Sequence, residues 1–387
     1  MAPASAVPLI LHRSDAVRIG LLTEYPLSHR AGWQSTVRRI REALEKRGHE
    51  IVLLHEAPDP HRAWKFLRRL RGKVGRTHLN EEQVRRGAAQ ADLRAQSVDL
   101  ILSVMGSRLL AAMRSDRPAV YVTDATGKRL RAEYPAHRAQ PKPSHAVEES
   151  VMARCALHVY SSEWARRSAI EEYGIDPAQA AVIPLGANLE PEPDCAPDPP
   201  APAPCQLLFV GRDWERKNGA ACFDILAELQ RRGVDARLQL VGQPAPEIPP
   251  QLADCVDHLG WLEVERAADA RRYREAYRSS HFLLLPTQAD CTPIVCAEAS
   301  AFGLPTIAPE VGGLSAMVET GSNGVLLARE ATPADYARCI EDLWRDQERY
   351  RALRASSARR HRELLNWDAW AAAIEPILQR ARQTRAA

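Results

Sequence analysis

The sequence has no long apolar run, no recognisable leader and little net charge. No apolar stretch in its 387 residues approaches the ~18 residues of a membrane-spanning helix. Residues 1–15 lack the basic start and long apolar centre of a signal peptide. The net charge of +3 is small for this length and gives no argument for nucleic acid. These absences predict a soluble, cytoplasmic protein.

The eight cysteines are scattered, without a CxxC pair and without the Cys/His spacing of a metal site. We therefore expect reduced thiols and no bound metal, rather than a disulfide framework. The composition, with 45% hydrophobic and 26% charged residues, is that of an ordinary globular protein. At 387 residues the chain is longer than one core usually supports, so two domains are expected.

Short apolar runs without alternation predict strands that are buried on both faces of parallel sheets. Helical patterns separate most of them, as in α/β proteins. In the first half the strands are expected at 17–23, 51–54, 98–105, 118–123, 157–160 and 181–184. In the second half they are expected at 206–210, 238–241, 255–259, 282–285, 306–308 and 325–327. We predict an α/β protein with two doubly wound, Rossmann-like domains that face each other across a cleft.

A proline-rich segment, EPEPDCAPDPPAPAP, divides the two halves. It cannot continue a helix or a sheet and is typical of a semi-rigid linker. We therefore expect a first domain at 1–190, a linker at 191–204 and a second domain at 205–365. Residues 366–387 are expected to form a helix whose apolar stripe packs on the first domain.

Two carboxylates and a predicted helix start occur within residues 281–313. Asp290 follows a buried strand, and Glu298 lies eight positions later, inside the next helix. Thr292 is predicted to cap that helix, with Pro293 at its first position. This order of strand, loop and helix places the segment at the carboxyl edge of a sheet, where ligands and anions bind. The residues expected to face a ligand are Asp290, Thr292, Ile294, Val295 and Glu298.

Cations for the same site are expected in residues 211–219, GRDWERKNG, which follow the first strand of the second half. Acids alone would repel a phosphate. Arg212 and Lys217 are predicted to reach the same sheet edge as Asp290 and to hold a diphosphate between them. The combination suits a ligand with hydroxyls at one end and phosphate in the middle.

Two residues of the first half lie at or near predicted strand ends. Gly32 would let the backbone approach a ligand, and a turn that needs glycine for its own conformation is an equal interpretation. Asp124 ends the strand 118–123, where parallel-sheet enzymes keep reactive groups. It equally suits the cap of the next segment.

Residues 61–76, HRAWKFLRRLRGKVGR, hold seven Lys or Arg and no acid. One interpretation is a basic amphipathic helix that contacts an anionic membrane, which would make the protein peripheral on the inner face. The other is a solvated helix that packs its apolar stripe on the domain, favoured because Gly72 and Gly75 weaken a helix. No recognised nucleic-acid module accompanies the patch, so nucleic acid is not an expected partner.

Together, GRDWERKNG and the D-x7-E pattern in ADCTPIVCAEASAFGLPTIAPEVGG resemble the retaining glycosyltransferases of family four. The resemblance extends through YVTDATGKRLRAEYP, HVYSSEWARRSAIEEYGI and VIPLGAN, and so covers nearly all of residues 17–375. It implies the glycosyltransferase B fold of bacterial enzymes of this type. The implied reaction moves a sugar, with retention, from a nucleoside-diphosphate sugar to a saccharide, glycolipid or cell-envelope glycan, without cofactor or metal.

The resemblance also implies roles for single residues. Arg212 and Lys217 would hold the donor diphosphate, Glu298 the ribose, and Asp290 would lie beside the transferred sugar. The implied donor-binding residues are Gly32, Gly211, Arg212, Lys217, Thr292, Ile294, Val295 and Glu298. The implied catalytic residues are Asp124, Arg212, Lys217 and Asp290.

Three positions depart from the family pattern. Asp290 is one methylene shorter than the usual glutamate, and Thr292-Pro293 replaces a common Phe-Gly, so that one amide donor is lost at Pro293. Asp124 stands where the family often has histidine; it could polarise the acceptor, orient the sugar or support the loop. A nucleotide-sugar epimerase, a phosphorylase of the same fold and a non-catalytic nucleotide-sugar binding module are the alternative functions.

Overall fold

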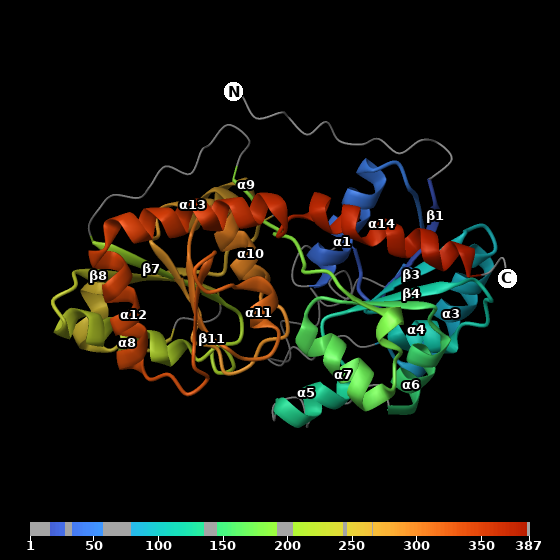
Figure 1. The fold of residues 1–387 in the computed structure, drawn as a ribbon, viewed down its shortest axis with the longest axis horizontal. Helices are drawn as coiled ribbons and strands as arrows, with labels where there is room; N and C mark the ends of the chain where they lie inside the picture. The colour runs from blue at the N-terminus through green and yellow to red at the C-terminus, as the bar shows by residue number, and fades with distance from the viewer. Residues whose placement is uncertain are drawn as a thin grey trace, which may run out of the picture.

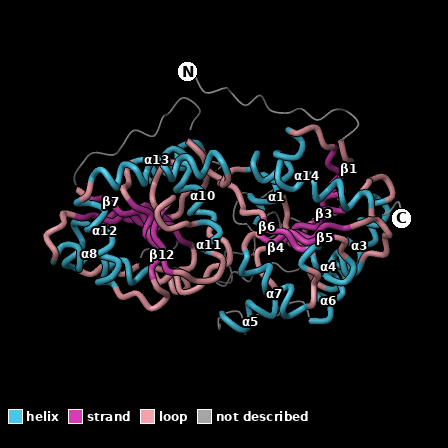
Figure 2. The backbone as a smooth tube through the Cα atoms, in the orientation of Figure 1, coloured by secondary structure: helices cyan, strands magenta, loops and turns pink. Residues whose placement is uncertain are grey.

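The computed structural model describes residues 16–27, 33–56, 79–134, 145–191, 204–242, 246–264 and 266–384. Two domains lie side by side, and each consists of a parallel sheet with helices on both faces (Figures 1 and 2). The predicted fold class, two doubly wound domains, is confirmed. Gly32 and the basic segment 61–76 lie outside the described residues.

The first sheet has the strand order β2-β1-β3-β4-β5-β6, and all its described pairs are parallel. Its strands are β1 (Arg18–Leu22), β2 (Glu50–Leu53), β3 (Leu100–Val104), β4 (Ala119–Thr123), β5 (Leu157–Tyr160) and β6 (Ala180–Val182). Every residue of β3, β4 and β5 is buried, which explains the unbroken apolar runs in the sequence. The order reverses between β1 and β3, where sheets of this kind open a crevice.

Helices cover both faces of the first sheet. They are α1 (Trp33–Lys46), α3 (Glu81–Ala95), α4 (Ser107–Ala112), α5 (Gly127–Glu133), α6 (His145–Arg154) and α7 (Glu163–Tyr173). Alternate strand residues face opposite layers: Leu100 and Leu102 pack in the core beneath α1, and Ile101 packs in the core beneath α3 and α4. This alternation is what fixes the sheet between its two helical layers.

The second sheet has the order β12-β11-β10-β7-β8-β9, also parallel. Its strands are β7 (Cys205–Gly211), β8 (Ala236–Gly242), β9 (Val256–Gly260), β10 (Phe282–Leu284), β11 (Thr306–Pro309) and β12 (Gly324–Leu327). The register of β7 on β8 runs from Cys205 opposite Ala236 to Gly211 opposite Gly242. Here the order reverses between β7 and β10.

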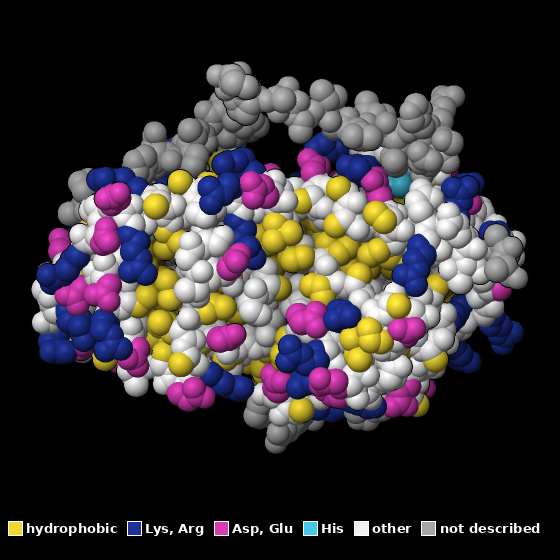
Figure 3. Space-filling view, in the orientation of Figure 1, with side chains coloured by type: hydrophobic (Ala, Val, Ile, Leu, Met, Phe, Trp, Pro, Cys, Tyr) yellow, Lys and Arg dark blue, Asp and Glu magenta, His cyan; other side chains and the backbone are white. Residues whose placement is uncertain are grey.

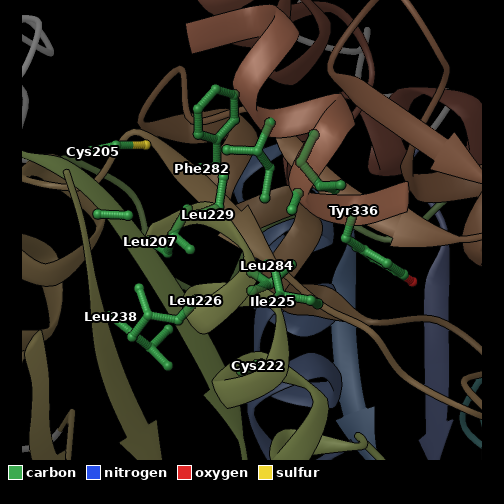
Figure 4. Packing of buried hydrophobic residues seen from close by; sticks show 14 of the residues in the cluster. Cys205, Leu207, Cys222, Ile225, Leu226, Leu229, Leu238, Phe282, Leu284 and Tyr336 are labelled. Atoms are coloured by element: carbon green, nitrogen blue, oxygen red, sulfur yellow. The ribbon is translucent and has the colours of Figure 1, made fainter. Parts of the chain in front are cut away.

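The helices of the second domain are α8 (Gly219–Arg231), α9 (Ala267–Arg278), α10 (Ile294–Ala301), α11 (Leu314–Met317), α12 (Pro333–Arg345) and α13 (Gln347–Glu363). Figure 4 shows one of its cores, in which Leu207 of β7, Phe282 of β10 and Leu226 of α8 pack together. The next residues along the two strands, Leu208 and Leu283, belong to the core on the opposite face.

The last helix, α14 (Trp367–Gln383), packs on the first domain although the helix before it, α13, covers the second (Figure 1). Trp370 is 1% exposed in the first domain's core. Ion pairs from α1 and the turn after it hold the same helix: Lys46 with Asp368 and Arg47 with Glu375, both at 2.5 Å. The chain therefore crosses between the domains a second time.

This second crossing lies beside the first. The amide of Ala187 donates to the carbonyl of Leu365 at 3.0 Å. A Cβ at Gly186 would stand 2.6 Å from the main-chain atoms of Asn366 and Trp367, so a larger residue at 186 would force the two crossings apart. Glycine is required there for close approach rather than for its torsion angles.

On the face shown in Figure 3, acidic and basic side chains are interspersed over both domains. On this face, therefore, the small net charge does not hide one large acidic patch and one large basic patch. Among the described helices none is both long and apolar enough to cross a bilayer.

Replacement of Trp370 tests how far α14 contributes to the first core. We expect Trp370→Ala to lower the free energy of unfolding by about 3–5 kcal/mol, because it leaves a cavity among α1, α14 and the sheet. Urea denaturation followed by circular dichroism measures the change. Leu93→Ala on α3, where the side chain is 70% exposed, is the control and should stay within about 0.5 kcal/mol of the wild type. Equal stability of the Trp370→Ala protein and the wild type would contradict the assignment.

Candidate active site

The loops after β7 and β10 meet where the order of the second sheet reverses. This is the position at which open α/β sheets bind ligands. The loop after β7 carries the predicted cations, and the loop after β10 carries Asp290. A groove of about 990 Å³ between β12, α12 and α13 lies elsewhere in this domain, and the candidate residues do not line it.

The loop after β7 is anchored by an aromatic residue. Trp214 packs edge-on against Phe209 of β7 at 5.5 Å and against Phe223 of α8 at 5.7 Å between ring centroids. Gly219 begins α8 directly against the Trp214 ring, where a Cβ would overlap it at 2.2 Å. The backbone then turns through a left-handed Asn218, with φ of 53°. This turn brings the preceding residue, Lys217, to the sheet edge.

Lys217 and Asp290 form an ion pair, and both are nearly buried, with 7% and 8% exposure. Arg216 adds a second cation, its Nη1 3.3 Å from Asp290 Oδ2. Two buried charges this close stabilise each other because each would otherwise lose its hydration without replacement. Asp290 and Lys217 were predicted to reach the same sheet edge. In the structure they form an ion pair there, and Arg216 joins them.

Arg216 also ties the two loops together through their main chains. Its guanidinium donates to the Ala289 carbonyl at 2.6 Å, while its own carbonyl accepts from the Gln288 amide at 3.0 Å. The Thr287 hydroxyl donates to the same carbonyl at 3.2 Å. Sequence reasoning missed Arg216. Its position three residues after Asp213, with which it also pairs at 3.3 Å, was the available signal.

Arg212, predicted to share a diphosphate with Lys217, lies at the rim of this edge. Its guanidinium stands over the ring of Trp261, 4.5 Å from the centroid, in the loop after β9. Trp261 is 41% exposed, which is unusual for a side chain of its size. Gly211 ends β7, and its carbonyl would lie 1.8 Å from a Cβ on Gly242, so these two strand ends are closely apposed.

Glu298 lies in the second turn of α10 and is 6% exposed. Tyr277 and Tyr273 of α9 donate to its Oε2 at 2.8 Å and 3.3 Å. Burial raises the pKa of the Glu298 carboxyl to about 7, although the two tyrosine hydroxyls and the amide of Leu189 stabilise its ionised form. The carboxyl is therefore held in place and poised to change charge near neutral pH.

The start of α10 differs from the prediction. The helix begins at Ile294 with Pro293 as its N-cap residue, and no side chain caps it. The prediction of Thr292 as the cap was wrong, because its hydroxyl lies 2.5 Å from that of Ser161 in the first domain. A contact between domains has replaced the local cap. The first amides of the helix, at Ile294 and Val295, have no acceptor within the helix and lie partly buried at the sheet edge.

Asp124 lies directly after β4, half-buried at the carboxyl edge of the first sheet. Of its two interpretations, the cap is ruled out, because Thr126 caps α5 by accepting from the Arg129 amide at 3.3 Å. Among the described residues no group of His, Cys, Asp or Glu forms a cluster that could hold a metal ion.

The first domain reaches the second at this site. Tyr134, directly after α5, donates its hydroxyl to the carbonyl of Asp290 at 3.1 Å. Together with the contact between Ser161 and Thr292, this bond joins the two domains at their carboxyl sheet edges.

Comparison with known proteins places this geometry in a family. The profile described as "Glycosyltransferase Family 4" matches residues 31–191, and that described as "Glycosyl transferases group 1" matches residues 204–346. The D-inositol 3-phosphate glycosyltransferase of Kineococcus radiotolerans is 32% identical over 308 residues, which cover 72% of this chain and 69% of that protein. This chain belongs to glycosyltransferase family 4.

Another relative, the D-inositol 3-phosphate glycosyltransferase of Gordonia bronchialis, is 29% identical over 64% of this chain and 57% of its own length. The matches of this chain thus span 57–69% of the length of these two relatives. The resemblance noted in the sequence is confirmed, and the protein is a glycosyltransferase with the GT-B fold.

Solved structures agree in fold. Sucrose-phosphate synthase from Thermosynechococcus elongatus has a TM-score of 0.66 at 18% identity and covers 96% of this family 4 chain and 100% of its own. Anabaena Alr3699/HepE in complex with UDP also has a TM-score of 0.66 at 18% identity, over 94% and 100% of the two chains. At such identities the likeness shows the fold alone.

The raised pKa of Glu298 predicts how stability depends on pH. The folded protein binds the Glu298 proton more tightly than the unfolded chain, whose carboxyl titrates near 4.5. Stability of the wild type should therefore fall, relative to Glu298→Gln, as pH rises from 4.5 to about 7, and level off above. The slope is at most about 1.4 kcal/mol per pH unit. Urea unfolding of both proteins across this range measures it; parallel curves would contradict the assignment.

Proposed function

We propose that this glycosyltransferase moves a sugar from a nucleoside-diphosphate donor to a hydroxyl acceptor, with retention and without a metal ion. One observation carries the proposal. Lys217 and Arg216 pair with Asp290 where the order of the second sheet reverses, and Glu298 lies buried in α10, the helix that follows Asp290. The carboxyl edge of the second sheet thus supplies cations that can bind phosphate and carboxylates that can bind hydroxyls.

The charges suit a diphosphate. Lys217 has three N–H donors, of which the bond to Asp290 uses one, so the others remain for phosphate oxygens. The open amides at the start of α10 add a partial positive charge beside them. When the donor splits, the bond between its anomeric carbon and the diphosphate oxygen breaks, and the electron pair leaves with the diphosphate. Lys217 and the helix start stabilise that growing charge, so this mechanism does not require a metal.

Glu298 is placed to accept from ribose hydroxyls in its ionised form. Trp261 offers a flat, exposed ring beside Arg212, on which a nucleobase can stack once the guanidinium turns to the phosphates. Structures with the same fold are described in complex with UDP and with UDP-glucose, which supports a nucleotide sugar as the first donor to test.

The acceptor approaches from the first domain. Its hydroxyl oxygen forms the new bond to the anomeric carbon, on the face from which the diphosphate leaves, and loses a proton to a basic oxygen in the cleft. Asp124, half-buried at the facing sheet edge, is the candidate. The relatives named D-inositol 3-phosphate glycosyltransferases make a phosphorylated polyol the first acceptor to test, with saccharides, glycolipids and cell-envelope glycans next. Cytoplasmic location and membrane contact of residues 61–76 stay predictions.

Lys217→Ala tests the central charge. Loss of a group that stabilises the leaving diphosphate should lower kcat about 100- to 1000-fold. Transfer from a panel of nucleotide sugars, chosen by the rise in melting temperature that each causes, measures the loss. Arg231→Ala is the control, because this cation of the same domain has a side chain that is 70% exposed. Turnover at the wild-type rate in the Lys217→Ala protein would remove Lys217 from the mechanism.

A wild type that binds nucleotide sugars but transfers none to the acceptor panel would favour the binding-module alternative.

Trp261→Ala tests the nucleobase contact. Loss of one stacking ring should weaken UDP binding by about 1–3 kcal/mol, measured by isothermal titration calorimetry. Trp261→Phe keeps a ring and should recover most of the affinity. If both variants bind UDP as the wild type does, the base binds elsewhere.

A further inference from the structure

The donor loop, residues 290–293, belongs to the second domain but is held by two hydroxyls of the first. Tyr134 donates to the Asp290 carbonyl at 3.1 Å, and the hydroxyls of Ser161 and Thr292 are 2.5 Å apart. Both partners in the loop precede α10, and one of them carries the carboxylate that pairs with Lys217. These contacts therefore bear on the donor site itself.

The Tyr134 hydroxyl lies against the Asp290 carbonyl and Gly312 of the second domain. The Asp290 carbonyl also accepts from the Gly313 amide at 3.1 Å. A Cβ at Gly312 would come within 2.0 Å of that carbonyl and 2.3 Å of the Tyr134 oxygen. Gly312 also has a φ of 55°, which favours glycine. The second domain thus leaves room at this point for a group that the first domain supplies.

The Tyr134 ring is fixed from its own side. It is 3% exposed and lies 5.9 Å from the Trp164 ring, between centroids. The Trp164 indole donates to Glu133 at 3.0 Å, and Glu133 pairs with Arg129 at 3.2 Å. Burial raises the pKa of the Tyr134 phenol well above its usual range, so the group stays a neutral donor. A buried carbonyl that lost this donor would be left less well satisfied.

The same short helix connects this contact to the acceptor side. Asp124 stands two residues before Thr126, the cap of α5, and Tyr134 follows the last residue of that helix. Only the loop after β4 and helix α5 thus separate the acceptor-side carboxylate from the hydroxyl that contacts the donor loop. A shift of Tyr134 relative to the donor loop would therefore also shift Asp124 relative to Asp290.

We propose that Tyr134 and Ser161 are positioning residues for sugar transfer: they hold the donor loop, and with it Asp290, in register with the acceptor side of the cleft. The inference rests on the proposed function. Neither hydroxyl needs to touch the donor, so their loss should affect turnover more than nucleotide binding.

Tyr134→Phe, Ser161→Ala and the double variant test this. Each single change should lower kcat about 2- to 10-fold, because each removes one hydrogen bond, and the double variant about 10- to 50-fold. The dissociation constant of UDP should stay within about twofold of the wild type, since the phosphate and base contacts are intact. Ser161→Thr keeps the hydroxyl and should therefore have a kcat closer to that of the wild type than Ser161→Ala has.

Tyr350→Phe is the matched control. Tyr350 is also 3% exposed and also donates to a main-chain carbonyl at 3.1 Å, that of His281, but within the second domain. The Tyr350→Phe protein should lose about as much stability as the Tyr134→Phe protein and keep the kcat of the wild type. A double variant whose kcat equals that of Tyr350→Phe overturns the proposal.

Hydrogen exchange provides a readout that needs no activity. In the protein without ligand, amides of residues 286–301 and Gly313 should exchange faster in the double variant than in the wild type or in Tyr350→Phe. Unchanged exchange there overturns the inference even if kcat falls. If the wild type transfers no sugar, the proposed function fails, while the exchange experiment still decides whether the two hydroxyls hold the loop.

Discussion

The ion pair between Lys217 and Asp290 is the interaction on which the rest of the site depends. Burial of a charge costs several kcal/mol unless a partner replaces its hydration, so each residue needs the other to be where it is. The pair joins loops from two strands that are neighbours in space but lie at the reversal of the sheet order. Arg216 then secures both loops through their carbonyls, so the loops stay together while Lys217 shares its remaining donors with a ligand.

Much of this could be predicted from residue patterns. The strands β3, β4 and β7 are apolar on both faces because helices cover both sides of each sheet. Such a run can be recognised from a few consecutive residues. Asp290 and Lys217 were expected at one sheet edge, and they form an ion pair between the loops after β10 and β7. Parallel topology alone brings the carboxyl ends of strands together.

What could not be predicted depends on tertiary contacts. GRDWERKNG offers three cations, and only the packing of Trp214 and the left-handed Asn218 decide that Arg216, rather than Arg212, faces Asp290. Thr292, followed by Pro293, fits the residue preferences at a helix start, but its hydroxyl contacts that of Ser161, 131 positions earlier. Partners so far apart in the chain leave no mark in the spacing of residues.

The paired crossings between the domains, at Ala187 and Leu365, limit how the halves can move. The line that joins these two crossings is a natural hinge axis, because the domains can rotate about it without stretching either connection. Rotation about any other axis would stretch both connections. Lengthening the proline-rich segment would therefore not free the halves, because the chain crosses before it: Leu185 packs in the first domain's core, while Ala187 and Leu189 pack in the second domain's core.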